Sequence, residues 1–174
     1  VDTLAASMGI SRYAAQEFMD EWFGLHPGIL DWHNRIQDQL QTTRSVSNAF
    51  GFRRFYFDRI EGLLPEAVAW IGQSTTACVT NRAIIALEAS KELQEMDFEI
   101  LFQVHDELVL HYPTYYRKPV LRLVSQLAHI TVPYPDPLVI PWGLKLSTKS
   151  WGDCEKPHEE FMRTVWPSVT TPTG

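Results

Sequence analysis

The chain has 174 residues, of which 45% are hydrophobic and 21% charged, a composition typical of one globular domain. Its formal net charge of -6 excludes the global basic signature of many nucleic-acid binders, so any such contact has to come from local patches. Two cysteines without zinc or disulfide spacing, no apolar run of 18 residues and no secretory leader pattern predict a soluble protein of the cytoplasm with no membrane contact.

Three helices are predicted in the first 43 residues. Gly9 can end a short helix, Ser11 is a good N-cap for a helix that runs to about Gly24, and Pro27 can open a third. After residue 43 the period changes, and short β-prone runs flank "NAFG", which indicates a hairpin. The chain therefore divides into a helical portion, residues 1–43, and a mixed portion that begins at residue 44.

Helices and hairpins also alternate in the rest of the chain. The predicted elements are a long helix at 65–94, a hairpin around "HDE", a helix at 115–130, an extended Pro-rich stretch and a last strand in "WGLKLSTKSW". We expect the mixed portion to end at 155 and residues 156–174 to form a mobile tail. Irregular alternation of helices with antiparallel hairpins predicts an α+β fold.

The stretch "FQVHDELVLHY" places charge between two apolar runs. His105, Asp106 and Glu107 would lie at the tip of an antiparallel hairpin. Asp is common in turns, so plain turn residues are one interpretation. Successive side chains on a strand point to opposite faces, so the two carboxylates can face one ligand only if the chain turns tightly between them. A metal site is the other interpretation.

Arginines and aromatic residues alternate between residues 44 and 59. Four arginines accompany a single acid, and this combination suits phosphates and stacked bases. The alternative is a hairpin with one apolar face and one solvated arginine face.

Several motifs together resemble family A DNA polymerases. "QVHDELVL" resembles their motif C hairpin, "GISRYAAQEFMDEWFGLHPGILDW" their later fingers helices, and "GFRRFYF" their Gly-Arg-Arg hairpin. "WIGQSTTACVTNRAI" resembles the helix that carries a minor-groove-reading Gln, and "SWGD" resembles the closing strand. The likeness spans residues 4–155, and its "QST" form is closer to phage members. It implies a palm-type antiparallel sheet behind a helical fingers portion, in an incomplete polymerase domain involved in DNA replication.

The resemblance also implies roles for individual residues. Asp106 would be a metal ligand, Glu107 an accessory carboxylate near the metals, and His105 a catalytic-site contact to the primer end. Gln73 would reach the DNA minor groove. Arg53 and Arg54 would lie near template or palm contacts. The chain departs from the family at Pro65 and Ala69, where members often have Arg and Asn, so the resemblance does not carry over that part of the minor-groove check.

Two family motifs do not occur in this sequence. One supplies a second Asp, in a stretch resembling "DYSQIE", and the other is the helix whose Lys and Tyr grip the incoming nucleotide. Two-metal chemistry needs carboxylates that converge from separate strands. The resemblance thus implies half of a Mg²⁺ site, with primer-template DNA, deoxynucleoside triphosphates and an N-terminal polymerase segment as partners. The isolated chain is expected to be inactive, and its palm sheet is expected to expose an edge.

Two other functions are compatible with these residues. One is a polymerase remnant that binds DNA or protein without catalysis. The other is a small metal-dependent nuclease that uses His105, Asp106, Glu107 and His111. A remnant would not regain DNA synthesis with an N-terminal segment, and a nuclease would cleave DNA without partner or nucleotide.

Overall fold

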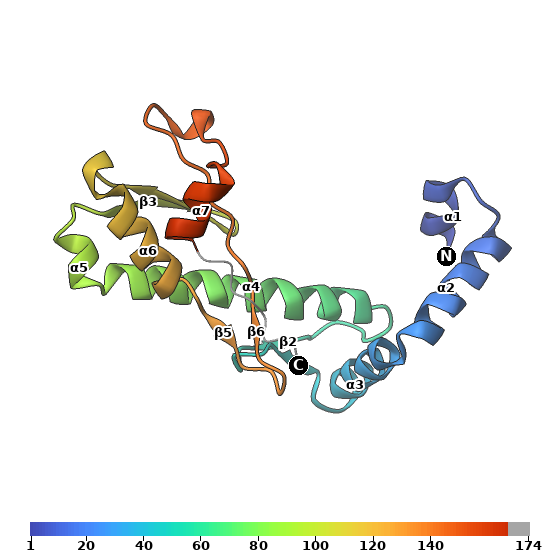
Figure 1. The fold of residues 1–174 in the computed structure, drawn as a ribbon. Helices are drawn as coiled ribbons and strands as arrows, with labels where there is room; N and C mark the ends of the chain where they lie inside the picture. The colour runs from blue at the N-terminus through green and yellow to red at the C-terminus, as the bar shows by residue number, and fades with distance from the viewer. Residues whose placement is uncertain (167–174) are drawn as a thin grey trace. The chain divides into compact units, whose positions relative to one another are not determined.

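Helices and short antiparallel hairpins alternate along the chain (Figure 1). The structure, a computed structural model, describes residues 1–166. The α-helices are α1 (Asp2–Met8), α2 (Arg12–Leu25), α3 (Pro27–Thr43), α4 (Leu64–Glu88), α5 (Lys91–Gln94), α6 (Arg117–Leu127) and α7 (Glu159–Val165). The strands are β1 (Ser45–Ser47), β2 (Arg53–Phe55), β3 (Glu99–Val104), β4 (Glu107–His111), β5 (Thr131–Val132) and β6 (Leu138–Val139). They pair as three antiparallel two-stranded sheets, β1-β2, β3-β4 and β5-β6. The α+β prediction is confirmed.

The chain forms two compact units. The first contains residues 1–47 and 53–71, and the second contains residues 48–52 and the chain from 72 onward. Helix α4 belongs to the first unit up to Ile71, and the tip of the β1-β2 hairpin belongs to the second. The predicted portions, residues 1–43, 44–155 and 156–174, divide the chain into fingers, palm and tail rather than into compact units. They stay a prediction.

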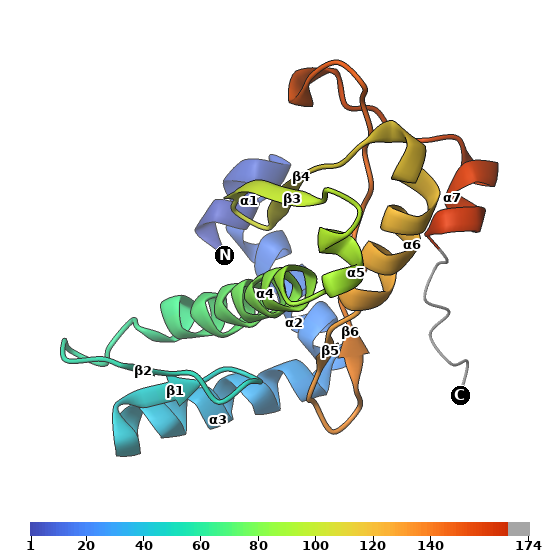
Figure 2. The same cartoon turned by 90° about the vertical axis from the view of Figure 1, so that its left-hand side faces the viewer.

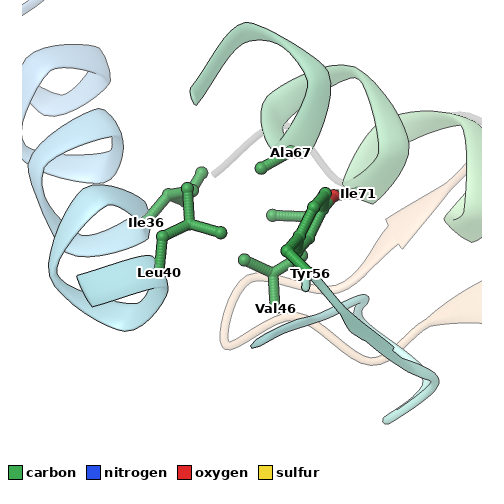
Figure 3. Close-up of a cluster of buried hydrophobic side chains, with 6 residues drawn as sticks. All are labelled: Ile36, Leu40, Val46, Tyr56, Ala67 and Ile71. Carbon is green, nitrogen blue, oxygen red and sulfur yellow. The ribbon is translucent and has the colours of Figure 1, made fainter. Parts of the chain in front are cut away.

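The first unit has a core built by three elements (Figure 3). Helix α3 contributes Ile36 and Leu40, and α4 contributes Ala67 and Ile71. Each pair is four residues apart, so both members lie on one helix face. Val46 of β1 and Tyr56, just after β2, complete the cluster; β1 packs against α3 (Figure 2).

Local signals set the ends of the first helices as predicted. Gly9 ends α1 in the left-handed conformation, with φ 65°, and the Ser11 side chain accepts a hydrogen bond from the Ala14 amide at the start of α2. Pro27 occupies the first turn of α3. None of the helices within residues 1–166 is long and apolar enough to cross a membrane.

The second unit packs helices against the β3-β4 hairpin. Its buried cluster joins Leu87 of α4, Leu93 of α5, and Val120 and Val124 of α6. Side chains of both strands, including Ile100 and Leu108, pack on this cluster. One face of the hairpin therefore packs against three helices, α4 and α5, which precede it in the sequence, and α6, which follows it.

Three predicted elements differ from the structure. The helix at 65–94 is two helices, because Ser90 accepts a hydrogen bond from the Leu93 amide and caps a new one. The helix at 115–130 shortens to α6, after a single 3₁₀ turn at Thr114–Tyr116. The Pro-rich stretch contributes β5 and β6, which form a small hairpin around residues 133–137.

The predicted last strand is wrong. Within residues 142–151 the β pairing is limited to an isolated backbone bridge, from Leu146 to Glu155. The predicted tail contains α7, whose Val165 is buried and which packs on α6 (Figure 1). The remainder of that tail, from residue 167, lies outside the described residues.

Candidate catalytic hairpin

The β3-β4 hairpin turns within two residues. Val104 pairs with Glu107, which leaves His105 and Asp106 as the turn. His105 has a φ of 54°, whereas Asp106 is not among the positive-φ residues. This sign pattern is that of a type II′ turn, which matches the twist of the two strands. The Gln103 side-chain amide donates to the His105 carbonyl oxygen at 2.7 Å and braces the turn. The tight turn is therefore present, with Asp106 in it and Glu107 directly after it.

Asp106 and Glu107 are exposed neighbours at this turn. Both line a cavity of about 380 Å³ in the second unit, together with Thr76 of α4 and Trp151. Two adjacent carboxylates disfavour each other's charge, and a bound cation relieves the repulsion. The turn is thus a place where a cation is electrostatically favoured.

A tryptophan from the C-terminal part of the chain contacts this hairpin. The Trp151 indole Nε1 donates to Glu107 Oε1 at 2.9 Å. Its ring packs edge-to-face on Phe102 of β3, with centroids 5.3 Å apart and an interplanar angle of 81°. Sequence reasoning missed this contact because 44 residues separate the partners. No local pattern in the sequence could have indicated it.

The donor set fits a partial magnesium site. Mg²⁺ is commonly held by one or two protein carboxylates, with waters and substrate phosphate oxygens completing an octahedron. Asp106 and Glu107 offer these carboxylates, while residues 1–166 contain no cluster of three or more His, Cys, Asp or Glu side chains able to hold a metal. The described residues provide at most part of a two-metal site.

His111 does not join the carboxylates. It pairs with Glu99 at the opposite end of the hairpin, where its Nδ1 lies 3.9 Å from Glu99 Oε2. Four residues of strand separate it from Glu107, which corresponds to roughly 13 Å. The structure therefore does not assemble the four-residue cluster that the nuclease interpretation requires.

Gln73 lies on the exposed surface of α4 in the same unit as the hairpin. Thr76, one turn further along α4, lines the cavity that Asp106 and Glu107 also line. Burial raises the pKa of Tyr112, another residue of the cavity wall, so its phenol stays protonated there. Gln73 is thus placed one helical turn from the wall of the carboxylate cavity.

Asn48 anchors the tip of the β1-β2 hairpin to α4. Its Oδ1 accepts from the amides of Phe50 and Phe52, each at 3.0 Å. Its Nδ2 donates to Ser74 Oγ at 3.1 Å and to Cys78 Sγ at 3.4 Å. The side chain is nearly buried, with 6% exposure. Asn in a hairpin loop is an ordinary turn signal, so its bonds to α4 were not predictable.

Arg53 and Arg54 belong to the first unit and differ in their contacts. The Arg54 guanidinium pairs with Glu66 and lies 4.9 Å from the centre of the Tyr56 ring. Arg53 is exposed, and its guanidinium lies 6.0 Å from the Phe55 ring centre. Arg44 is also engaged internally, because its Nε donates to the Tyr56 carbonyl at 3.1 Å. Only part of the arginine set is thus free of contacts with the rest of the first unit, and both interpretations of this hairpin stay predictions.

Known proteins resemble this chain over most of its length. The family model for DNA polymerase family A matches residues 1–152. DNA polymerase I of Pseudomonas aeruginosa is 32% identical over 115 residues, which cover 62% of this chain and 12% of that protein. The thermostable DNA polymerase I of Thermus aquaticus is 28% identical over 148 residues, which cover 81% of this chain and 18% of that protein. The chain thus spans less than a fifth of the length of these relatives.

The fold also resembles a solved polymerase structure. The POL domain of Pol1 from M. smegmatis, in complex with DNA primer-template and dNTP, matches with a TM-score of 0.66 and 24% identity. The match covers 76% of this chain and 24% of that chain, and it supports a common fold. Since the match to the family model spans residues 1–152 of the 174, this chain belongs to DNA polymerase family A.

Proposed function

We propose that the chain is the C-terminal, fingers-and-palm part of a DNA-directed DNA polymerase that extends primers during DNA replication. One observation carries the proposal: within the family match, a two-residue turn sets Asp106 and Glu107 side by side at the tip of a supported hairpin. The phage-type assignment rests on the "QST" at residues 73–75, whereas the relatives named above are bacterial.

Each predicted site residue has a place in this function. Asp106 and Glu107 would hold Mg²⁺, which when bound supplies positive charge to the transferring phosphate oxygens. His105, in the turn itself, would contact the primer end. Gln73 would read the minor groove beside it, and Arg53 would meet the DNA backbone. Arg54 would also lie near the DNA. Its ion pair with Glu66 would in addition orient the β1-β2 hairpin.

Completion of the site requires another segment. Asp106 and Glu107 are consecutive, so they cannot converge on two metal ions from separate strands, and residues 1–166 offer no third ligand beside them. We infer that an N-terminal segment supplies a second Asp and the nucleotide-binding helix, either as a separate polypeptide or in the same protein. The partners would then be primer-template DNA and deoxynucleoside triphosphates, which the M. smegmatis complex contains. The protein would act in the cytoplasm.

Primer extension with Mg²⁺ and four nucleotides tests the proposal. The chain alone should be silent, the chain with an N-terminal family A segment should synthesise DNA, and Asp106→Ala should abolish that synthesis. Asp136→Ala is the matched control, because Asp136 is an exposed acid in the loop between β5 and β6. Silence from a folded mixture that binds DNA would instead indicate a non-catalytic remnant.

A further inference from the structure

Glu107 has a neutral hydrogen-bond donor that the polymerase resemblance does not assign a role. The Trp151 indole N–H donates to Glu107 Oε1 at 2.9 Å. The indole N–H is a donor only, so the nitrogen is not a metal ligand and does not cancel the carboxylate charge. The bond fixes one oxygen of Glu107 and leaves Oε2 available to another ligand.

The aromatic contact fixes the other side of Trp151. The Phe102 ring on β3 holds the indole edge-to-face at 5.3 Å between centroids. Phe102 is two residues before Val104, and Val104 pairs with Glu107, so Phe102 and Glu107 project from the same face of the hairpin. Trp151 therefore packs on the face from which Glu107 projects, close to the turn.

The loop that carries Trp151 is braced by its own hydrogen bonds. Reciprocal backbone bonds join Leu146 and Glu155, at 2.9 and 3.1 Å, and close the loop at its base. The Ser147 hydroxyl accepts from the amides of Lys149 and Ser150, and Ser150 donates to Asp153. Trp151 then begins a 3₁₀ turn, Trp151–Asp153. Trp151, which is 51% exposed, therefore lies in a loop that hydrogen bonds close at its base.

From these contacts we propose that Trp151 is a positioning residue that orients the Glu107 carboxylate toward the metal site. The inference rests on the proposed polymerase function, in which Glu107 lies near the metals. Partners of metal-ligating carboxylates orient them, and loss of such a partner typically lowers metal affinity or activity 10- to 100-fold. The C-terminal loop is thereby part of the catalytic hairpin's support.

The test separates the N–H from the ring. Trp151→Phe keeps an aromatic ring against Phe102 but removes the donor, and Phe102→Leu keeps the donor but removes the ring contact. Mn²⁺ binding is measured by electron paramagnetic resonance in the complete polymerase, with primer-template DNA that ends in a dideoxynucleotide. Trp151→Phe should weaken Mn²⁺ binding about tenfold, whereas Phe102→Leu, which keeps the donor and only loosens the ring, should weaken it less. An equal loss for the two variants would show that the ring contact, and not the N–H, positions Glu107. In the Glu107→Gln background, Trp151→Phe should add nothing further.

A second measurement confirms that the variants are folded. In the 174-residue chain, nuclear magnetic resonance of the indole N–H groups gives one signal for each of the six tryptophans. Trp151→Phe should remove one signal and leave the other five in place, and Glu107→Ala should move that same signal.

The outcomes distinguish the positioning role from the function. If Trp151→Phe binds Mn²⁺ within twofold of the unmodified protein while Asp106→Ala abolishes binding, the positioning role is wrong and the polymerase assignment stands. If Asp106→Ala leaves both Mn²⁺ binding and DNA synthesis unchanged, the proposed function itself is wrong.

Discussion

His105 adopts a backbone conformation that side chains rarely take. Its φ of 54° lies in the left-handed region, where His, Asn and Asp are tolerated better than β-branched residues. A glycine would meet no steric cost here, so the turn itself does not call for the His side chain, and its role in contacting the primer stays a prediction.

His105→Val should therefore destabilise the chain by about 1–2 kcal/mol, because a β-branched side chain is strained at positive φ. His105→Asn should change the free energy of unfolding by less than about 0.5 kcal/mol. Urea unfolding measures both variants. A loss of primer extension in His105→Asn, at unchanged stability, would assign the imidazole to the primer; equal stability of the Val variant would contradict the strained turn.

Tyr56 buries a hydroxyl that finds no hydrogen-bond partner within the described part of the chain. Desolvation raises the pKa of Tyr56 above its usual value of 10, opposed by the Arg54 charge. In the folded protein the phenol therefore stays neutral to higher pH than in the unfolded chain. Ionisation of Tyr56 therefore leaves the free energy of unfolding unchanged below about pH 10. Above that, the free energy of unfolding falls as pH rises through the folded-state pKa.

Tyr56→Phe should raise the free energy of unfolding by about 1 kcal/mol at pH 7, because it removes an unsatisfied buried polar group. The advantage of the variant should grow above pH 10, where the unfolded tyrosine ionises and the folded one does not. Unfolding curves at pH 7 and above pH 10 measure this. Tyr13→Phe is the control, since Tyr13 is 73% exposed and should show no such change. A destabilised Tyr56→Phe variant would contradict the absence of a partner.

At the scale of elements, one side chain, that of Asn48, makes the hydrogen bonds that join the tip of the β1-β2 hairpin to α4. Asn48 makes four hydrogen bonds, two within the loop and two to α4, and Arg82 of α4 lies 4.6 Å from the centre of the Phe50 ring. Because the Asn48 side chain bonds both the loop amides and the α4 side chains, its removal breaks all four hydrogen bonds together.

Asn48→Ala should lower the free energy of unfolding by about 2–4 kcal/mol, since several buried bonds are lost together. Asn81→Ala is the matched control, because Asn81 is exposed on the same helix and alanine favours helix there by roughly 0.5 kcal/mol. Thermal and urea unfolding measure the difference. A cost for Asn48→Ala no larger than that for the control would show that the tip of the hairpin is not held by this residue.

Elements with local signals could be predicted from the sequence, and elements that depend on a partner could not. Ser11 and Pro27 mark helix starts by capping chemistry, which acts within one turn. Ser90 interrupts an apolar pattern that continues on both sides, so the break between α4 and α5 was hidden. The alternation in residues 142–151 predicted a strand, but alternation specifies a strand only where another strand pairs with it.

The candidate site follows the same rule. The turn at His105 and Asp106 was predictable because strand pairing and a polar break are local. The bond from Trp151 to Glu107 and the anchor from Asn48 to α4 join segments 44 and 26 residues apart, and their geometry follows from the packed fold alone.

At the scale of the whole molecule, the charge balance limits how DNA can be bound. The net charge of -6 opposes a polyanion, so affinity has to come from arginines that face outward. Arg54 and Arg44 are engaged within the first unit, by Glu66 and by backbone carbonyls. Arg53 is exposed and has no ion pair within residues 1–166, which makes it the better candidate for a phosphate contact.

Arg53→Ala should therefore reduce the slope of log affinity against log salt by about 0.9, the value for one lost phosphate contact on duplex DNA. Fluorescence anisotropy of a primed duplex, with the chain and its N-terminal segment, measures the slope. Lys118→Ala is the charge-matched control, because Lys118 is exposed in the first turn of α6. It removes one positive charge at a residue that the family resemblance does not place at the DNA. An equal fall in slope for both variants would mean that net charge, and not the exposed arginine of the hairpin, governs binding.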